Sequence, residues 1–340
     1  MYSNFKITKN KNATVTIEGE LPHDELSRHR ARVLGELGRD IELPGFRKGH
    51  VPEKLLISHV GEGALLQGMA EHALSEHYPK ILSHHGIDAI GRPAVSLTKL
   101  APGNPLGFKI ETAIVPVLSL PDYKELAKKH VAQSKKEEVV VTEDEISKFI
   151  ETALKEKNER AGKKDEPLPE ITDELVKEFG AFTDVADFKA KIKDGLLHDK
   201  KHKARETLRI TILQDITDHT KVVMPDILVE AELDKMYSQF THDIERFGLK
   251  PDEYMTHIKK TPEDLRKEWR PDAEKAAKQQ LILHDISVAE KIQPTADEIK
   301  KEVDHILSHH KDAKRPHVEA YVATALANQK VLEFLEKQDA

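Results

Sequence analysis

Cysteine is absent from this 340-residue sequence, and so are long hydrophobic runs. Without cysteine the chain has no disulfide framework, no thiolate zinc site and no cysteine nucleophile. No run of about 18 apolar residues occurs, so the sequence predicts no membrane-spanning helix. The N-terminus lacks the apolar core followed by small residues that is typical of a secretory signal. We therefore expect a cytosolic protein.

Glycine becomes scarce after the first third of the chain. Twelve of the 16 glycines lie between Gly19 and Gly107, and only four follow. Turns need glycine, whereas long helices exclude it. This distribution predicts a compact, turn-rich first part followed by a mostly helical part.

Charge divides the chain at a similar point. Lys and Arg number 53 and Asp and Glu number 60 in the whole chain, and residues 1–120 hold 14 and 13 of these. The acidic excess therefore lies entirely in residues 121–340. This excess argues against a general nucleic-acid binder, and we expect no DNA partner.

The first part carries both strand and helix patterns. Alternating β-branched residues predict two strands near the N-terminus, and two more strands close the unit after a helical region. The pattern predicts an α+β domain with an antiparallel sheet. The predicted strands are residues 5–8, 13–18, 94–100 and 108–115, and the predicted helices are residues 24–41, 55–57 and 65–82.

The second part is predicted to be an all-α, multi-helix domain. Thr142 and Glu145 have the spacing of a capping box, which predicts a helix start. Residues 135–141 are expected to be an extended linker, and the charged residues 156–169 an exposed connector. Further predicted helices span residues 183–220, 225–247, 262–292 (with a break or kink at Pro271), 294–307 and 317–335.

The loop Gly45-Phe-Arg-Lys-Gly-His-Val-Pro52 is the most informative stretch of the sequence. It places an aromatic residue and two adjacent cations at the tip of a glycine-bounded loop between two helices. An outward-facing Phe46 favours an apolar pocket on a partner, and Arg47 and Lys48 can pair with phosphate or carboxylate. The alternative is an ordinary helix–helix loop in which Phe46 folds inward.

This loop resembles the Gly-Phe-Arg-x-Gly-x-x-Pro signature of the trigger factor family, the bacterial ribosome-associated chaperones. The resemblance extends along most of the chain. Residues 86–93 resemble the end of that family's ribosome-binding domain, residues 168–180 resemble the opening of its helical domain, and residues 223–230 share its Val-Pro-x-x-Leu character. It implies a ribosome-binding domain in residues 1–120, a linker in 121–141 and a helical chaperone domain with cradle and arms in 142–340.

The resemblance also implies partners and site residues. Docking on the large ribosomal subunit near the exit tunnel, through contacts to protein and rRNA, would use Gly45, Phe46, Arg47, Lys48 and Gly49. The helical domain would then shield nascent or unfolded polypeptides. No phosphate-binding loop occurs, so ATP is not required, and no cofactor is expected. Adaptable Met and aromatic side chains are the candidates for client binding, with ordinary core packing as the alternative. They are Met224, Met236, Tyr237, Phe240 and Tyr254.

One departure from the family concerns catalysis. Trigger factors usually carry an FKBP-like prolyl isomerase domain between the linker helix and the segment that here begins at Leu168. The connector 156–169 is too short to hold such a domain, so we expect no enzyme activity and no catalytic residue. Two alternatives remain: a prolyl isomerase, and a ribosome-free holdase or assembly scaffold. Because free trigger factors can dimerise, a homodimer is a further possibility.

Histidine is unusually frequent, with 19 residues. His198 with His202, and His305 with His309, have a spacing that puts two imidazoles on one side of a helix. Two imidazoles without a third ligand make a poor zinc site, so we expect no metal. A response to pH near 6 is conceivable because many histidines gain charge there.

Overall fold

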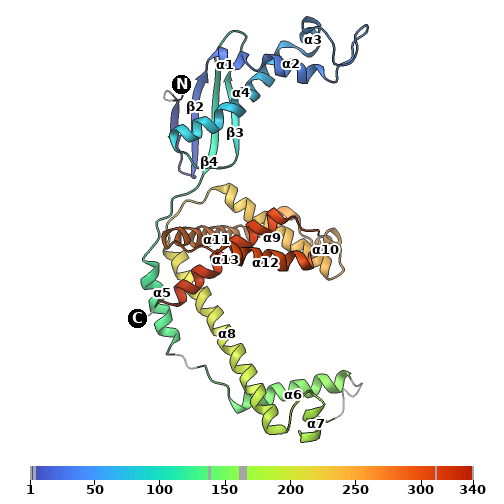
Figure 1. The fold of residues 1–340 in the computed structure, drawn as a ribbon, viewed down its shortest axis with the longest axis vertical. Helices are drawn as coiled ribbons and strands as arrows, with labels where there is room; N and C mark the ends of the chain where they lie inside the picture. The colour runs from blue at the N-terminus through green and yellow to red at the C-terminus, as the bar shows by residue number, and fades with distance from the viewer. Residues whose placement is uncertain (1, 3–4, 137–138, 161–166, 311, 339–340) are drawn as a thin grey trace. The chain divides into compact units, whose positions relative to one another are not determined.

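The structure is a computed structural model that describes residues 2, 5–136, 139–160, 167–310 and 312–338. Figure 1 labels its helices and strands. The chain divides into two compact units, one made of Met1–Ser119 and Lys221–Lys278, the other of Leu120–Thr220 and Gln279–Ala340. The division expected from the resemblance, into residues 1–120, 121–141 and 142–340, stays a prediction.

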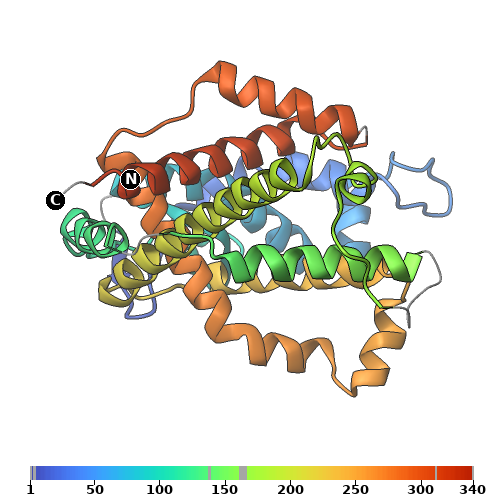
Figure 2. The same ribbon diagram turned by 90° about the horizontal axis from the view of Figure 1, so that it is seen from below.

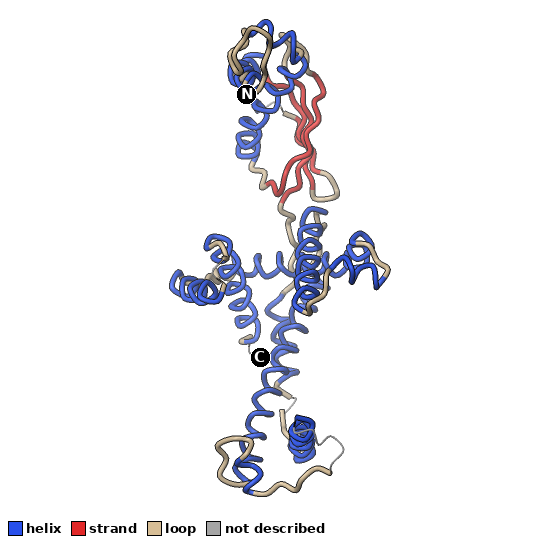
Figure 3. Tube along the Cα trace, turned by 90° about the vertical axis from the view of Figure 1, so that its right-hand side faces the viewer, coloured by secondary structure: helices blue, strands red, loops and turns tan. Residues whose placement is uncertain are grey.

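A four-stranded antiparallel sheet lies in the first unit, as the alternating pattern predicts. Its strands are β1 (Lys6–Lys9), β2 (Thr14–Leu21), β3 (Ala89–Lys99) and β4 (Leu106–Ile114). They pair in the order β1-β2-β4-β3, drawn in red in Figure 3. The predicted fold class, an α+β N-terminal part followed by a helical part, is confirmed.

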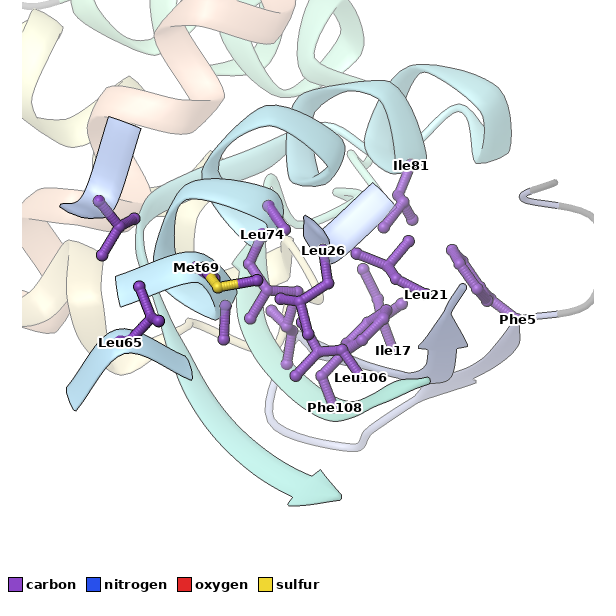
Figure 4. Packing of buried hydrophobic residues seen from close by; sticks show 14 of the residues in the cluster. Phe5, Ile17, Leu21, Leu26, Leu65, Met69, Leu74, Ile81, Leu106 and Phe108 are labelled. Carbon is purple, nitrogen blue, oxygen red and sulfur yellow. The ribbon is translucent and has the colours of Figure 1, made fainter. Parts of the chain in front are cut away.

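The core of this sheet faces helix α4 (Glu62–His85). Alternate residues of β2 and β4, among them Ile17 and Phe108, are buried because successive side chains of a strand point to opposite faces. They pack with Leu65, Met69 and other residues of α4, as Figure 4 shows. A hydrogen bond of 2.8 Å from the Tyr78 hydroxyl to Thr112 Oγ1 also joins α4 to β4.

Two short helices replace the single helix predicted over residues 24–41, so that prediction is wrong. These are α1 (His23–Ser27) and α2 (Arg30–Gly38). The turn between them lets both Leu26 and Val33 reach the sheet core. Helix α2 ends at Gly38, where a Cβ atom would lie 3.1 Å from Leu56 of α3 (Glu53–Val60).

Three helices complete the described part of the first unit. They are α9 (Asp226–Arg246), α10 (Pro251–Ile258) and α11 (Pro262–Ala289), whose last residues belong to the second unit. Of the predicted break or kink at Pro271, the break is wrong, because α11 continues through it, and the kink stays a prediction. A proline removes one backbone hydrogen bond, and the buried stripe that includes Leu265, Ala273 and Ala277 offsets this loss.

The second unit is helical in its described residues. Helix α8 (Val185–His219) is the longest, and α6 (Glu143–Arg160) begins at the predicted capping box, in which the Thr142 N–H donates to Glu145 at 2.9 Å. Helix α7 (Asp173–Lys177) packs on α8. Helices α12 (Ala296–His309) and α13 (Arg315–Glu336) lie side by side (Figure 2).

The expected linker and connector are only partly described. The linker 121–141 contains helix α5 (Tyr123–Ser134), which was not predicted and is capped by the Asp122 side chain. Within the connector 156–169, α6 extends to Arg160, and residues 161–166 lie outside the described residues.

Candidate functional site

Backbone geometry shapes the loop between α2 and α3 into a tight turn. Gly45 and Gly49 have φ angles of 88° and 79°, in the left-handed region that side chains disfavour. The Phe46 N–H donates to the Leu43 carbonyl at 3.0 Å, and the His50 N–H donates to the Arg47 carbonyl at 2.9 Å. The two glycines are therefore required by the turn itself.

Phe46 remains partly in solvent at the tip of this loop. Its exposed fraction is 37%, so it does not fold into the domain core as the alternative interpretation required. Arg47 and Lys48 are exposed beside it. Lys48 Nζ lies 3.1 Å from Asp40 Oδ1, and Arg30, the first residue of α2, forms an ion pair of 2.5 Å with Glu53, the first residue of α3 after the loop. The result is an apolar and cationic tip on a braced stem.

A second candidate surface is a groove between α9 and the part of α11 that belongs to the first unit. Met236, Phe240 and Trp269 form its apolar lining, with a volume of about 420 Å³. The Phe240 and Trp269 rings lie edge to face with centroids 5.4 Å apart. Glu232 and Asp243 are among the charged residues at its border.

The structure gathers most of the candidate client-binding residues around Phe240. The centroids of the Tyr254 and Tyr237 rings lie 5.9 and 6.4 Å from that of Phe240. Met224 instead packs on the cluster that contains Val229. All five candidates are half-buried, so each contributes to packing and still presents surface.

Sequence reasoning missed two parts of this region. Trp269 was not singled out, although it is the only tryptophan in the chain. Phe247 was not singled out either, and it is 84% exposed in the turn after α9, beside the half-exposed Leu249. The signal for that turn was Gly248, which has a φ angle of 76°.

A ladder of ion pairs holds α9 against α11 beside the groove. Arg266 binds Glu230 at 2.7 Å and Asp234 at 2.6 Å, and Arg270 binds Glu230 and Asp226, both at 2.6 Å. The hydrogen bonds from Arg266 and Arg270 lower the pKa of the Glu230 carboxyl below its usual value. These charge-assisted bonds fix the separation of the two helices and hence the width of the groove.

Neither a metal cluster nor a membrane span is found in the described part of the chain. No group of three or more His, Cys, Asp or Glu residues there could hold a metal ion. The His305 and His309 rings lie edge to face with centroids 5.1 Å apart. Among the described helices, none has the length and apolar character needed to cross a membrane.

Comparison with solved structures supports the fold described above. A structure described as "Promiscuous Substrate Recognition in Folding and Assembly Activities of the Trigger Factor Chaperone" is 15% identical and has a TM-score of 0.58. The match covers 98% of this chain and 99% of that one. At this identity the likeness shows the fold alone.

Sequence relatives extend over most of the chain. A trigger factor of Caldicellulosiruptor saccharolyticus is 22% identical, with 89% of this chain and 87% of the relative covered. One of Halalkalibacterium halodurans is 24% identical, with 86% of each covered. The first alignment spans 382 positions although this chain has 340 residues, so the relative carries inserted residues.

Family models match nearly the whole chain. The model described as "Bacterial trigger factor protein (TF)" matches residues 3–179, and "Bacterial trigger factor protein (TF) C-terminus" matches residues 184–338. No model of a prolyl isomerase domain matches. The chain therefore belongs to the trigger factor family of chaperones.

Proposed function

We propose that this protein is an ATP-independent chaperone that docks on the large ribosomal subunit near the exit tunnel and shields emerging polypeptides in the cytosol. The observation that carries the docking step is the partly exposed Phe46 beside two exposed cations on a glycine-shaped loop. The aromatic ring supplies apolar area that is costly to leave in water, and Arg47 and Lys48 supply contacts to ribosomal protein or rRNA.

Shielding of clients is assigned to the groove between α9 and α11. A holdase needs apolar surface set among solvated charges, so that it binds unfolded chains without aggregating itself. The half-buried Met236 and Phe240 provide such surface, and Glu232 and Asp243 keep its border hydrated. Binding the unfolded chain lowers its free concentration by mass action, and this needs no nucleotide.

Ribosome co-sedimentation tests the docking step. The triple variant Phe46→Ala, Arg47→Ala, Lys48→Ala should lose co-sedimentation while its helix content by circular dichroism is unchanged. A matched control is Phe247→Ala, Arg246→Ala, Lys250→Ala, which removes the same residue classes from the exposed turn after α9. The control should still pellet with ribosomes. Unchanged pelleting of the loop variant would refute docking through this loop.

Suppression of aggregation tests the shielding step independently. Met236→Ser with Phe240→Ser should weaken the protection of a denatured reporter protein, with and without ATP, and leave ribosome pelleting intact. Ile210→Ser is the matched control because Ile210 is 67% exposed on a different helix, α8. If the parent chain does not pellet with ribosomes but still suppresses aggregation, the alternative of a ribosome-free holdase gains support.

A further inference from the structure

A cluster of histidine and glutamate side chains lies where α2 packs on α4. His29, the residue that precedes α2, and Glu36 of α2 face His72 and Glu76 of α4. The pairs are reciprocal: His29 Nε2 lies 3.6 Å from Glu76, and His72 Nε2 lies 2.7 Å from Glu36. Each element therefore contributes one imidazole and one carboxylate to the contact.

The two imidazoles lie against each other between these pairs. The His29 and His72 rings are stacked, with centroids 6.0 Å apart and an interplanar angle of 21°. Their side chains are only 13% and 25% exposed. Protonation of both rings would place two like charges face to face at a poorly solvated contact.

Other charged groups surround the cluster on every packed element. Arg32 of α2 binds Glu36 at 2.9 Å, and Lys80 of α4 binds Glu76 at 2.6 Å, so both carboxylates already have a cation partner. A third imidazole on α4, that of His77, belongs to the same cluster and is only 3% exposed.

The partners of His77 come from other segments. Its Nδ1 atom lies 2.8 Å from the Tyr2 hydroxyl, and its Nε2 atom lies 3.4 Å from Glu25 of α1, which also binds Arg28. The cluster therefore links three helices. Few unpaired carboxylates remain in it to offset the positive charge that protonation of the imidazoles would add.

The balance of these forces disfavours a proton on His29. Burial lowers the pKa of the His29 imidazole below its usual value of 6.5, and the charges of His72, His77 and Arg32 act in the same direction, against Glu76. A histidine whose pKa is lower in the folded state contributes full stability above pH 6.5. That contribution falls as the pH drops below 6.5, because the unfolded chain then binds the proton more readily.

We propose that this cluster is a pH-sensitive joint, in which acidification loosens the packing of α2 on α4. Helix α2 ends at Gly38 and leads directly into the loop that carries Phe46. A loosened α2 widens the range of positions of that loop. On the proposed function, mild acid therefore weakens ribosome docking without altering any residue of the loop.

Hydrogen exchange of the full chain tests the joint without reference to ribosomes. After correction for the intrinsic pH effect, protection of the α2 amides relative to those of β2 should fall at least about threefold between pH 7.5 and 5.5. His29→Gln should abolish this fall. His59→Gln, which changes an exposed histidine of α3, should retain it.

The outcomes separate the joint from the docking proposal. A pH-independent α2 in the parent chain, or a response that persists in both His29→Gln and the second variant His72→Gln, would overturn the joint. An α2 response that the variants abolish supports it. Co-sedimentation of the parent chain with ribosomes, measured at both pH values, tests the docking proposal separately. A parent chain that does not co-sediment at either pH contradicts the proposed function but does not affect the conclusion from hydrogen exchange.

Discussion

At the scale of single residues, the loop that we propose to dock on the ribosome carries a cation, Lys48, that is already paired within the chain. Lys48 is already paired with Asp40 at 3.1 Å, and both side chains are mostly exposed. Exposed ion pairs contribute little to stability, so under the proposed function a ribosomal phosphate would readily replace Asp40 as the partner of Lys48. The carboxylate nevertheless has to be displaced, and it lowers the positive potential of the tip.

Removing the Asp40 carboxylate is expected to strengthen the proposed docking on the ribosome. Asp40→Asn should raise ribosome affinity by about two- to fivefold in a pelleting titration, the effect of one exposed pair. Glu42→Gln makes the same change in net charge nearby and serves as the control, with a smaller expected gain. An Asp40→Asn variant that binds no better than the control would show that Lys48 does not contact the ribosome.

Gly19 provides a stability test of the sheet core. A Cβ atom there would lie 2.3 Å from the Phe5 ring, which itself stacks edge to face on Phe108. Gly19→Ala should destabilise the sheet by about 1–3 kcal/mol, the usual cost of overpacking. Gly63→Ala in α4, where a Cβ atom meets nothing within 4 Å, should be neutral or stabilising. Urea denaturation followed by circular dichroism measures both.

At the scale of elements, a clamp joins the end of α13 to α8. Arg205 Nη2 lies 2.8 Å from Glu336 Oε2, and Arg209 also binds this carboxylate. Although burial raises the pKa of Glu336, hydrogen bonds from the two arginines lower it below its usual value on balance. The contribution of the clamp is therefore present above pH 4.5 and lost as the pH falls through the lowered pKa.

Glu336→Gln should accordingly destabilise the α8–α13 contact at pH 7 by about 1.5–3 kcal/mol, the range for hydrogen bonds to charged groups. The difference between the parent and the variant should shrink as the pH falls below 4.5. Glu333→Gln, one turn away on α13, is the control and should cost less. Equal unfolding free energies for the parent and Glu336→Gln at pH 7 would contradict the clamp.

At the scale of the whole molecule, the question is whether the chain catalyses prolyl isomerisation. The segment between α6 and residue 168 is far shorter than the roughly 50 residues of a small domain. We expect the purified chain to give no rate above the spontaneous rate in a protease-coupled assay with a prolyl peptide. A commercial isomerase in the same assay supplies the positive control. Any reproducible catalysis would restore the isomerase alternative.

Local pattern alone determined several features of this protein. The strand alternation, the capping box at Thr142 and the proline-opened helices depend on interactions between residues close in sequence, and the structure contains them. The Gly45–Pro52 motif likewise identified the loop and its family resemblance. Such features are predictable because their physical causes lie within one helical turn or one strand.

Tertiary structure decided what distant residues do to each other. The break between α1 and α2 and the continuity of α11 through Pro271 follow from burial against other elements, which outweighs local preference. The stacking of His29 on His72, the contact of Phe240 with Trp269 and the clamp on Glu336 join residues far apart in the chain. The energies of these contacts depend on side-chain packing and on the burial of both partners together. The spacing of residues along the sequence gives no information on either.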